Sequence, residues 1–139
     1  WAIDERDQEL IRVNTENGKN LLSMAGSLEK ITAEIISNAY TKGDVLARKI
    51  VEDTGKYLAA GIVSIVNVFN PCCLILGGGV IEGIPNLIQI AKNLVKSNAL
   101  EVSVSGLKII KGTLGPNAAV IGSANLAQNL VKIDSRINH

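Results

Sequence analysis

The feature that most constrains this chain is an uncharged stretch over residues 58–81 that contains both a helix stop and a glycine turn. Its length and hydropathy match those of a membrane span. However, the Asn-Pro pair at 70–71 ends a helix, and three glycines at 77–79 would not continue one inside lipid. The stretch therefore predicts a buried helix, then a buried strand over residues 72–76, and then a turn. We expect no membrane partner.

The segments on either side of this stretch alternate between helical and extended patterns. Helices are expected from the cap Ser27, from the cap Asp44 to about Phe69, and over 84–95 and 117–131, with extended chain over 101–110. In finer detail, Pro85 should lie in a first helical turn, and Gly106 should form a bulge. Strands that alternate with helices predict an α/β domain with a mostly parallel sheet.

Composition narrows the class of protein. The 139 residues are 47% hydrophobic and 19% charged, which is typical of one globular domain with a core of its own. The net charge is +1 and no basic patch stands out, so we expect no nucleic-acid binding by this segment. The only two cysteines, Cys72 and Cys73, are adjacent, and with the single His139 they do not make a zinc site. They indicate small apolar side chains in a reduced, cytoplasmic protein.

The chain is expected to divide into three parts. It begins at Trp1, which suggests a piece of a longer protein. Residues 1–25 are interpreted as a poorly defined lead-in that continues a neighbouring lobe, with a turn-rich part over 14–20. Residues 26–131 should form a compact lobe, and the polar residues 132–139 a frayed tail.

The strongest motif is the glycine turn Gly77-Gly78-Gly79 after an apolar strand. Such a strand delivers its turn to the carboxyl edge of a parallel sheet, where ligands bind in open α/β folds. Glycines there let the backbone approach a ligand and leave amides free to meet oxygen or phosphate. The alternative is a plain tight turn from strand to helix.

A second motif runs from Gly115 to Ala124, where Ala118, Gly122 and Ala124 give the predicted helix a thin face. Such a face can lie against a planar ligand group or against another helix, and the second situation is the more common. Taken alone, this motif does not choose between them.

Together, the two motifs resemble the C-terminal part of ROK proteins (repressor, open reading frame, kinase). The shared order is a long helix ending in Asn-Pro, an apolar strand, Gly-Gly-Gly, and then Leu-Gly-x-x-Ala-x-x-Ile-Gly-x-Ala, and it covers residues 26–128. The resemblance implies the C-terminal lobe of an actin-like (ribonuclease H-like) ATPase fold. It also implies that Gly77, Gly78 and Gly79 lie near ATP, and that Gly115 and Ala118 lie on the adenine side.

The family also carries a zinc-binding cysteine cluster that ends in Gly-Cys-Leu-Glu. Here the tetrapeptide is Gly-Ser-Leu-Glu at 26–29, and Asn20 and Leu22 stand at the other cysteine positions. We therefore expect no zinc. Glu29 is retained, and the resemblance implies that it hydrogen-bonds the sugar ring. Its alternative role is that of a first-turn glutamate favoured by the helix dipole.

The resemblance implies a glucokinase-like, ATP-dependent sugar kinase that uses Mg²⁺. The family's catalytic aspartate and phosphate-binding turns lie upstream of this segment, so no catalytic residue is assigned here. The chain alone is expected to be inactive without its N-terminal lobe. Two alternatives stay open, the effector lobe of a sugar-responsive repressor and a scaffold lobe for dimer contacts. The expected partners are a sugar, a nucleotide and a second copy in a homo-oligomer.

Overall fold

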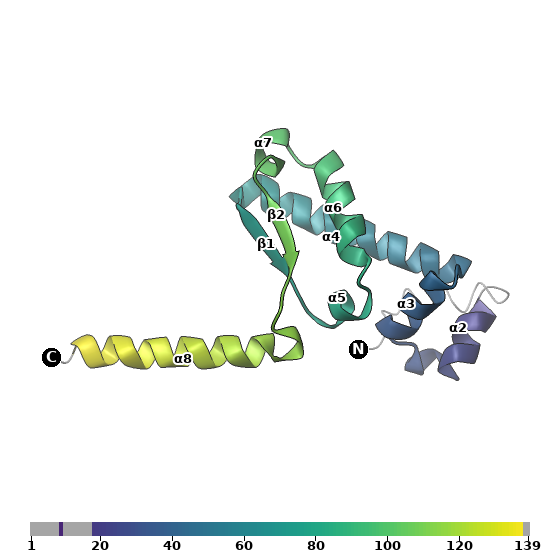
Figure 1. Ribbon diagram of the computed structural model, residues 1–139, viewed down its shortest axis with the longest axis horizontal. Helices are drawn as coiled ribbons and strands as arrows, with labels where there is room; N and C mark the ends of the chain where they lie inside the picture. Colours follow the sequence, from purple (N-terminus) through teal and green to yellow (C-terminus); the bar gives the residue numbers. More distant parts are fainter. Residues whose placement is uncertain (1–8, 10–17, 138–139) are drawn as a thin grey trace.

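The computed structural model describes residue 9 and residues 18–137 (Figure 1). The predicted lead-in therefore lies outside the described residues except for Glu9 and 18–25, as do the last two residues of the predicted tail. The described elements, in chain order, are α2 (Gly18–Ala25), the 3₁₀ turn η1 (Leu28–Lys30), α3 (Ala33–Thr41), α4 (Val45–Phe69), β1 (Cys73–Leu76), α5 (Gly79–Gly83), α6 (Leu87–Asn98), α7 (Glu101–Val104), β2 (Lys108–Lys111), the 3₁₀ turn η2 (Gly115–Asn117) and α8 (Ala118–Ile137).

The long helix α4 contributes to both parts of the core, and its two ends confirm the predicted helix from the cap Asp44 to Phe69. The carboxylate of Asp44 caps the first turn by accepting a hydrogen bond from the Ala47 N–H at 2.8 Å. At the other end, Asn70 adopts the left-handed conformation with φ 44°, and Pro71 follows. No helix in the described ranges is both long and apolar enough to cross a membrane.

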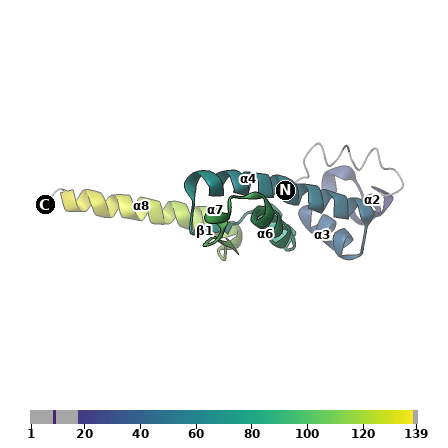
Figure 2. The same cartoon turned by 90° about the horizontal axis from the view of Figure 1, so that it is seen from above.

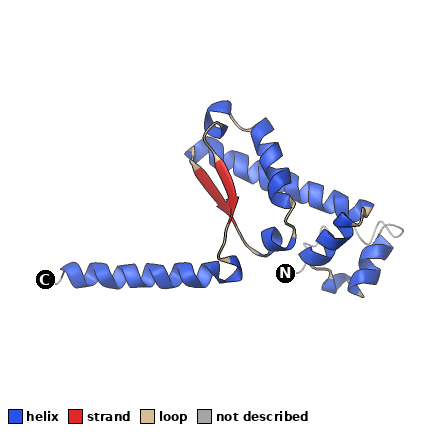
Figure 3. Cartoon of the chain, viewed as in Figure 1, coloured by secondary structure: helices blue, strands red, loops and turns tan. Residues whose placement is uncertain are grey.

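The two strands form a parallel pair, in which Cys73 lies beside Lys108 and Leu76 beside Lys111. The chain crosses from β1 to β2 through α5, α6 and α7 (Figure 3). Because the strands are parallel, both of their carboxyl ends lie at one edge of the sheet. The glycine turn leaves this edge from β1, and the segment leading to η2 leaves it from β2.

The core has two clusters, both of which lie along α4. Buried residues of α2, α3, α5, the first half of α4 and the start of α6, together with Ile31 between η1 and α3, form one cluster around Leu21 and Ile50. The second cluster joins Ile62 and Val66 of α4 to α6 and to Ile109 of β2. Helices α4 and α6 therefore cover one face of the sheet.

The opposite face of the sheet is exposed, and Cys73, Ile75 and Ile110 lie on it. The prediction of a fully buried strand, with Cys72 and Cys73 as buried small residues, was therefore wrong for the described part of the chain. The physical reason is that the described helices pack on one side of the sheet only. An apolar run predicts that both faces of a strand are covered by other segments, but it does not identify those segments.

The prediction of extended chain over 101–110 was correct only for its last part. Residues 101–104 form the short helix α7, and Gly106 lies in the turn before β2 and not in a bulge. The Leu100 N–H, just before α7, donates to the Asn67 side-chain oxygen of α4 at 3.1 Å. This tertiary contact fixes the chain before α7.

Three helix starts also differ from the prediction. Thr32, and not Ser27, caps α3 with its hydroxyl, since Ser27 precedes only the short η1 turn and makes no side-chain cap bond. Helix α6 begins at Leu87, so Pro85 precedes it. Residues 18–20, expected to be part of a turn, are helical in α2.

Helix α8 extends away from the rest of the lobe in both views (Figures 1 and 2). It continues to Ile137, beyond the predicted end at Val131. Its described side chains are exposed, including the apolar Val120, Leu126 and Leu130.

Candidate functional site

The glycine turn at 77–79 is open and exposed. Gly78 has φ +102° and ψ 167°, a backbone conformation that other residues rarely adopt, so glycine is required there by geometry. A Cβ atom at Gly77 or Gly78 would meet no atom within 4 Å. No neighbour in the structure therefore explains the glycine at 77, and the turn leaves space for a ligand to approach the backbone.

Helix α5, which follows the turn, is held against the start of α3. A Cβ atom at Gly83 would lie 2.7 Å from the Cβ of Ala33, closer than real contacts of this kind. Glycine at 83 is therefore needed for the close approach of the two helices. This packing places α5, the helix that follows the glycine turn, against the start of α3, which is far away in the sequence.

A polar cavity of about 570 Å³ lies between α3 and α5. Its lining residues come from the start of α3 and from α5 with its flanks: Thr32, Ala33, Glu34, Ser37, Asn38, Gly79, Glu82, Gly83 and Pro85. Hydroxyl, amide and carboxylate groups face it, and none of its lining residues is a lysine, arginine or histidine. The cavity therefore suits a neutral, hydroxyl-rich group better than a bare phosphate.

An ion pair ties this cavity to the end of the sheet. The Nζ atom of Lys111, at the end of β2, lies 2.6 Å from Oε2 of Glu82 on α5. Both side chains are partly exposed, so the pair contributes little to stability. It shows that α5 lies beside the carboxyl edge from which the glycine turn emerges.

The structure brings only some of the predicted site residues together. Gly79 lines the cavity, and Gly77 and Gly78 lead into it. Gly115, with φ +54°, and the exposed Ala118 lie where the chain leaves β2 and do not line it. Glu29 is exposed in η1 and does not line it either.

The polar residues of α3 were missed by sequence reasoning. Thr32 hydrogen-bonds the Ile35 N–H as a cap, and Ser37 and Asn38 follow on the same helix. A threonine directly before a helical run that carries a glutamate in its first turn is a usable cap signal. The cavity itself depends on the contact between α3 and α5, which no local pattern reveals.

The positions at which the resemblance places the family's zinc cysteines carry no thiolate. Asn20 and Leu22 lie in α2, and Ser27 precedes η1. Among the described residues, no three His, Cys, Asp or Glu side chains are grouped closely enough to hold a metal ion. The absence of zinc remains a prediction.

The ROK family profile matches residues 9–130. This chain belongs to the ROK family. Its relatives include the DNA-binding transcriptional dual regulator NagC of Escherichia coli K12, 27% identical over 67% of this chain and 23% of NagC. They also include a glucokinase of Halalkalibacterium halodurans, 30% identical over 70% of this chain and 30% of that enzyme. This ROK chain thus spans less than a third of either relative.

The fold of this ROK chain is also found in a protein of Cytophaga hutchinsonii that has been proposed to be a sugar kinase. The two structures superimpose with a TM-score of 0.68 at 24% identity, covering 86% of this chain and 40% of the other. The expected actin-like ATPase fold of the C-terminal lobe is therefore confirmed.

Proposed function

We propose that this chain is the nucleotide-side lobe of an ATP-dependent, glucokinase-like sugar kinase. The observation that carries the proposal is the open glycine turn at 77–79, which leads into a polar cavity at the carboxyl edge of the sheet. The 30% identity to a glucokinase supports it. In the assembled enzyme, a sugar hydroxyl would attack the γ-phosphate of ATP, with Mg²⁺ supplying charge neutralisation when it is bound.

The cavity is proposed to hold the nucleoside end of ATP. Its volume lies within the range of small-molecule pockets. Ser37, Asn38 and Glu34 offer donors and acceptors for ribose hydroxyls and base edges. Since no cation lines the cavity, the phosphates would pass along the glycine turn toward groups outside this segment.

Three further residues keep their proposed roles from the family resemblance. Gly115 and Ala118, which do not line the cavity, would border the adenine from outside it, on the side where the chain leaves β2. Glu29 would accept hydrogen bonds from the sugar ring, for which its exposed carboxylate is available. A catalytic base is not assigned in this chain.

A second candidate function is the effector lobe of a sugar-responsive repressor. The specific observation in its favour is the match to NagC over 67% of this chain. A repressor lobe has to respond to sugar and has no need of a nucleotide. Nucleotide binding therefore separates the two candidates, and it depends directly on the glycine turn.

The test is to titrate the chain with adenosine and with ATP, and to measure binding by isothermal titration calorimetry and saturation-transfer NMR. We expect both ligands to bind, with affinities within about threefold of each other, because no cation lines the cavity. Gly77→Val should weaken binding at least tenfold. Gly106→Val is the matched control, since Gly106 is also open and lies outside the cavity.

Two outcomes would contradict the proposal. If neither ligand binds the folded chain, the cavity is not a nucleoside site, and the repressor function is favoured. If Gly77→Val and Gly106→Val weaken binding equally, the glycine turn does not contact the ligand.

A further inference from the structure

A second cavity, of about 960 Å³, lies along β2 between α6 and α7 and is separate from the polar cavity beside the glycine turn. Its floor is apolar and includes Val95 of α6, Val104 of α7 and Ile109 of β2. We call this cavity the β2 groove. None of the residues that line it lines the polar cavity, so the proposed kinase function does not use it.

The backbone of β2 offers hydrogen-bonding groups toward the side that β1 leaves free. The N–H groups of Lys108 and Gly112 donate to Cys72 and Leu76, which places them on the β1 side. Peptide groups alternate along a strand, so those of Ile109 and Lys111 face the opposite edge. In the part of the chain that the structure describes, no strand pairs with that edge.

Three lysines border the β2 groove. Lys92 and Lys96 lie one turn apart on α6, and Lys108 lies on β2. None of the three forms an ion pair with another described residue. Glu101 is the one carboxylate among the lining residues, so the groove has an excess of positive charge.

We propose that the β2 groove binds an extended acidic peptide segment of a partner protein, which adds to β2 as a further strand. The main chain of the peptide would pair with the free peptide groups of Ile109 and Lys111. On the face toward α6, apolar side chains would pack on the floor and acidic ones would meet Lys92 and Lys96, whereas acidic side chains on the other face would meet Lys108. The interaction therefore has a hydrogen-bonding, an apolar and an electrostatic component.

The charges disfavour a second copy of this chain as the occupant. Pairing of two copies of β2 edge to edge would bring Lys92, Lys96 and Lys108 of both copies together, and like charges repel. Lysines on the strand alone would be sufficient to protect an exposed edge. Lys92 and Lys96 come from α6, and they extend the positive charge over the apolar floor, where it favours an acidic ligand.

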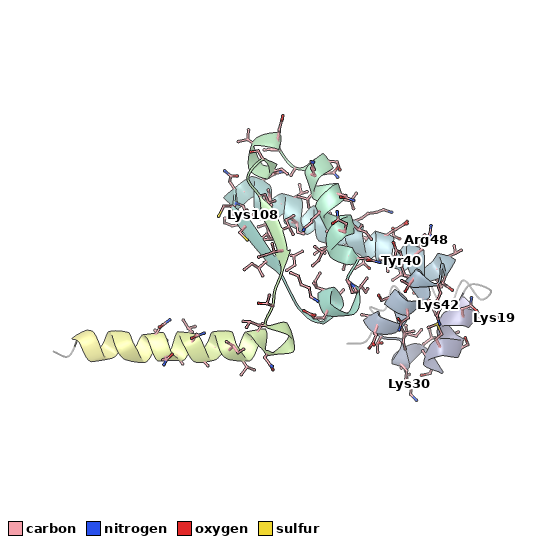
Figure 4. All side chains as sticks on the ribbon, in the orientation of Figure 1. Lys19, Lys30, Tyr40, Lys42, Arg48 and Lys108 are labelled. Carbon is pink, nitrogen blue, oxygen red and sulfur yellow. The ribbon has the colours of Figure 1, made fainter. Side chains whose placement is uncertain are left out.

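The test is fluorescence anisotropy with a labelled peptide of two Val-Val-Glu-Glu repeats, which carries apolar and acidic residues on both faces of the added strand. We expect saturable binding that weakens at least tenfold in the Lys92→Glu/Lys96→Glu double variant. The control Lys30→Glu/Lys42→Glu changes the charge equally at exposed sites near α2 and α3, remote from Lys108 (Figure 4), and should shift the affinity less than twofold. Hydrogen exchange of the Ile109 and Lys111 amides should slow at least tenfold in the complex.

Four results would overturn the proposal. A peptide in which proline replaces alternate residues lacks the N–H groups for pairing, so equal binding of that peptide would exclude strand addition. Equal binding of decanoate would indicate an anionic-amphiphile site. A dimer in ultracentrifugation that the Lys92→Glu/Lys96→Glu variant changes would indicate self-association. If the peptide does not bind the folded chain, the lysines serve only to protect the free edge of β2 from pairing with other strands.

Discussion

The contact between Gly83 and Ala33 can be tested by adding a single methyl group. In Gly83→Ala, the new Cβ would lie 2.7 Å from the Ala33 Cβ and 3.4 Å from the backbone carbon of Ala33 and the nitrogen of Glu34. Carbon atoms prefer separations of about 3.5–4.0 Å, so α5 would have to move by roughly 1 Å. Overpacking of this kind costs about 1–3 kcal/mol.

Part of that cost is offset in the unfolded state. Replacing glycine by alanine restricts the unfolded chain and stabilises the fold by about 0.4–1 kcal/mol where no contact is violated. The net expectation for Gly83→Ala is therefore a loss of about 1–2 kcal/mol in the free energy of unfolding. Adenosine affinity should fall as well, because α5 carries the end of the glycine turn.

The assay is urea denaturation followed by far-UV circular dichroism, in a double-mutant cycle with Ala33→Gly. Removing the Ala33 methyl takes away the shortest contact, and the next two are at 3.4 Å. Ala33→Gly alone should cost no more than about 1 kcal/mol. The double variant should be more stable than the sum of the two single losses by about 1–2 kcal/mol. Simple additivity would show that the two helices do not meet at these residues.

Four further predictions rest on the structure or on the family resemblance. Gly61→Ala, on an open face of α4, should stabilise the fold by about 0.5–1 kcal/mol, whereas Gly55→Ala should fail to do so because its Cβ would meet Ile90 at 2.5 Å; urea midpoints decide this. In the full-length protein, Glu29→Gln should weaken sugar binding less than Glu29→Ala, each with a nearly unchanged melting temperature; an intact affinity with a small fall in melting temperature would remove Glu29 from the site. Elemental analysis after dialysis should find no stoichiometric zinc, and about one zinc per chain would mean that the alignment of Ser27 with a family cysteine is mistaken. A coupled ATP assay with a panel of hexoses should show no turnover by this chain, and a rate clearly above buffer would refute the assignment of the base to another segment.

Features governed by neighbouring residues were predictable from the sequence. The limits of α4 follow from Asp44 as a cap and Asn70-Pro71 as a stop, both of which act within one turn of the helix end. The position of β1 follows from its apolar run and the glycines behind it. The required glycine at 78 follows from the turn that has to begin α5.

Features governed by tertiary contact were not predictable. The alternating Val-Ser-Val pattern at 102–104 fits a strand as well as a short helix, and the Asn67 contact before α7 lies far away in the sequence. The polar cavity forms because Gly83 of α5 packs against Ala33 of α3. Since this contact joins segments far apart in the sequence, the sequence could not predict that side chains of α3 line the cavity. Likewise, the apolar character of Ile75 did not reveal that the described helices leave its face open.

The parallel pairing of β1 and β2 also sets the order in which the lobe can assemble. Pairing β2 with β1 closes the long chain loop that contains α5, α6 and α7. The conformational entropy of that loop is lost before the hydrogen bonds between the strands can compensate for it. Helix α4 can form and dock with α6 earlier, since each helix is stabilised within its own segment. We therefore expect the sheet to be the late-forming element in refolding, and the carboxyl edge with its glycine turn to be the last part of the lobe to become competent for a ligand.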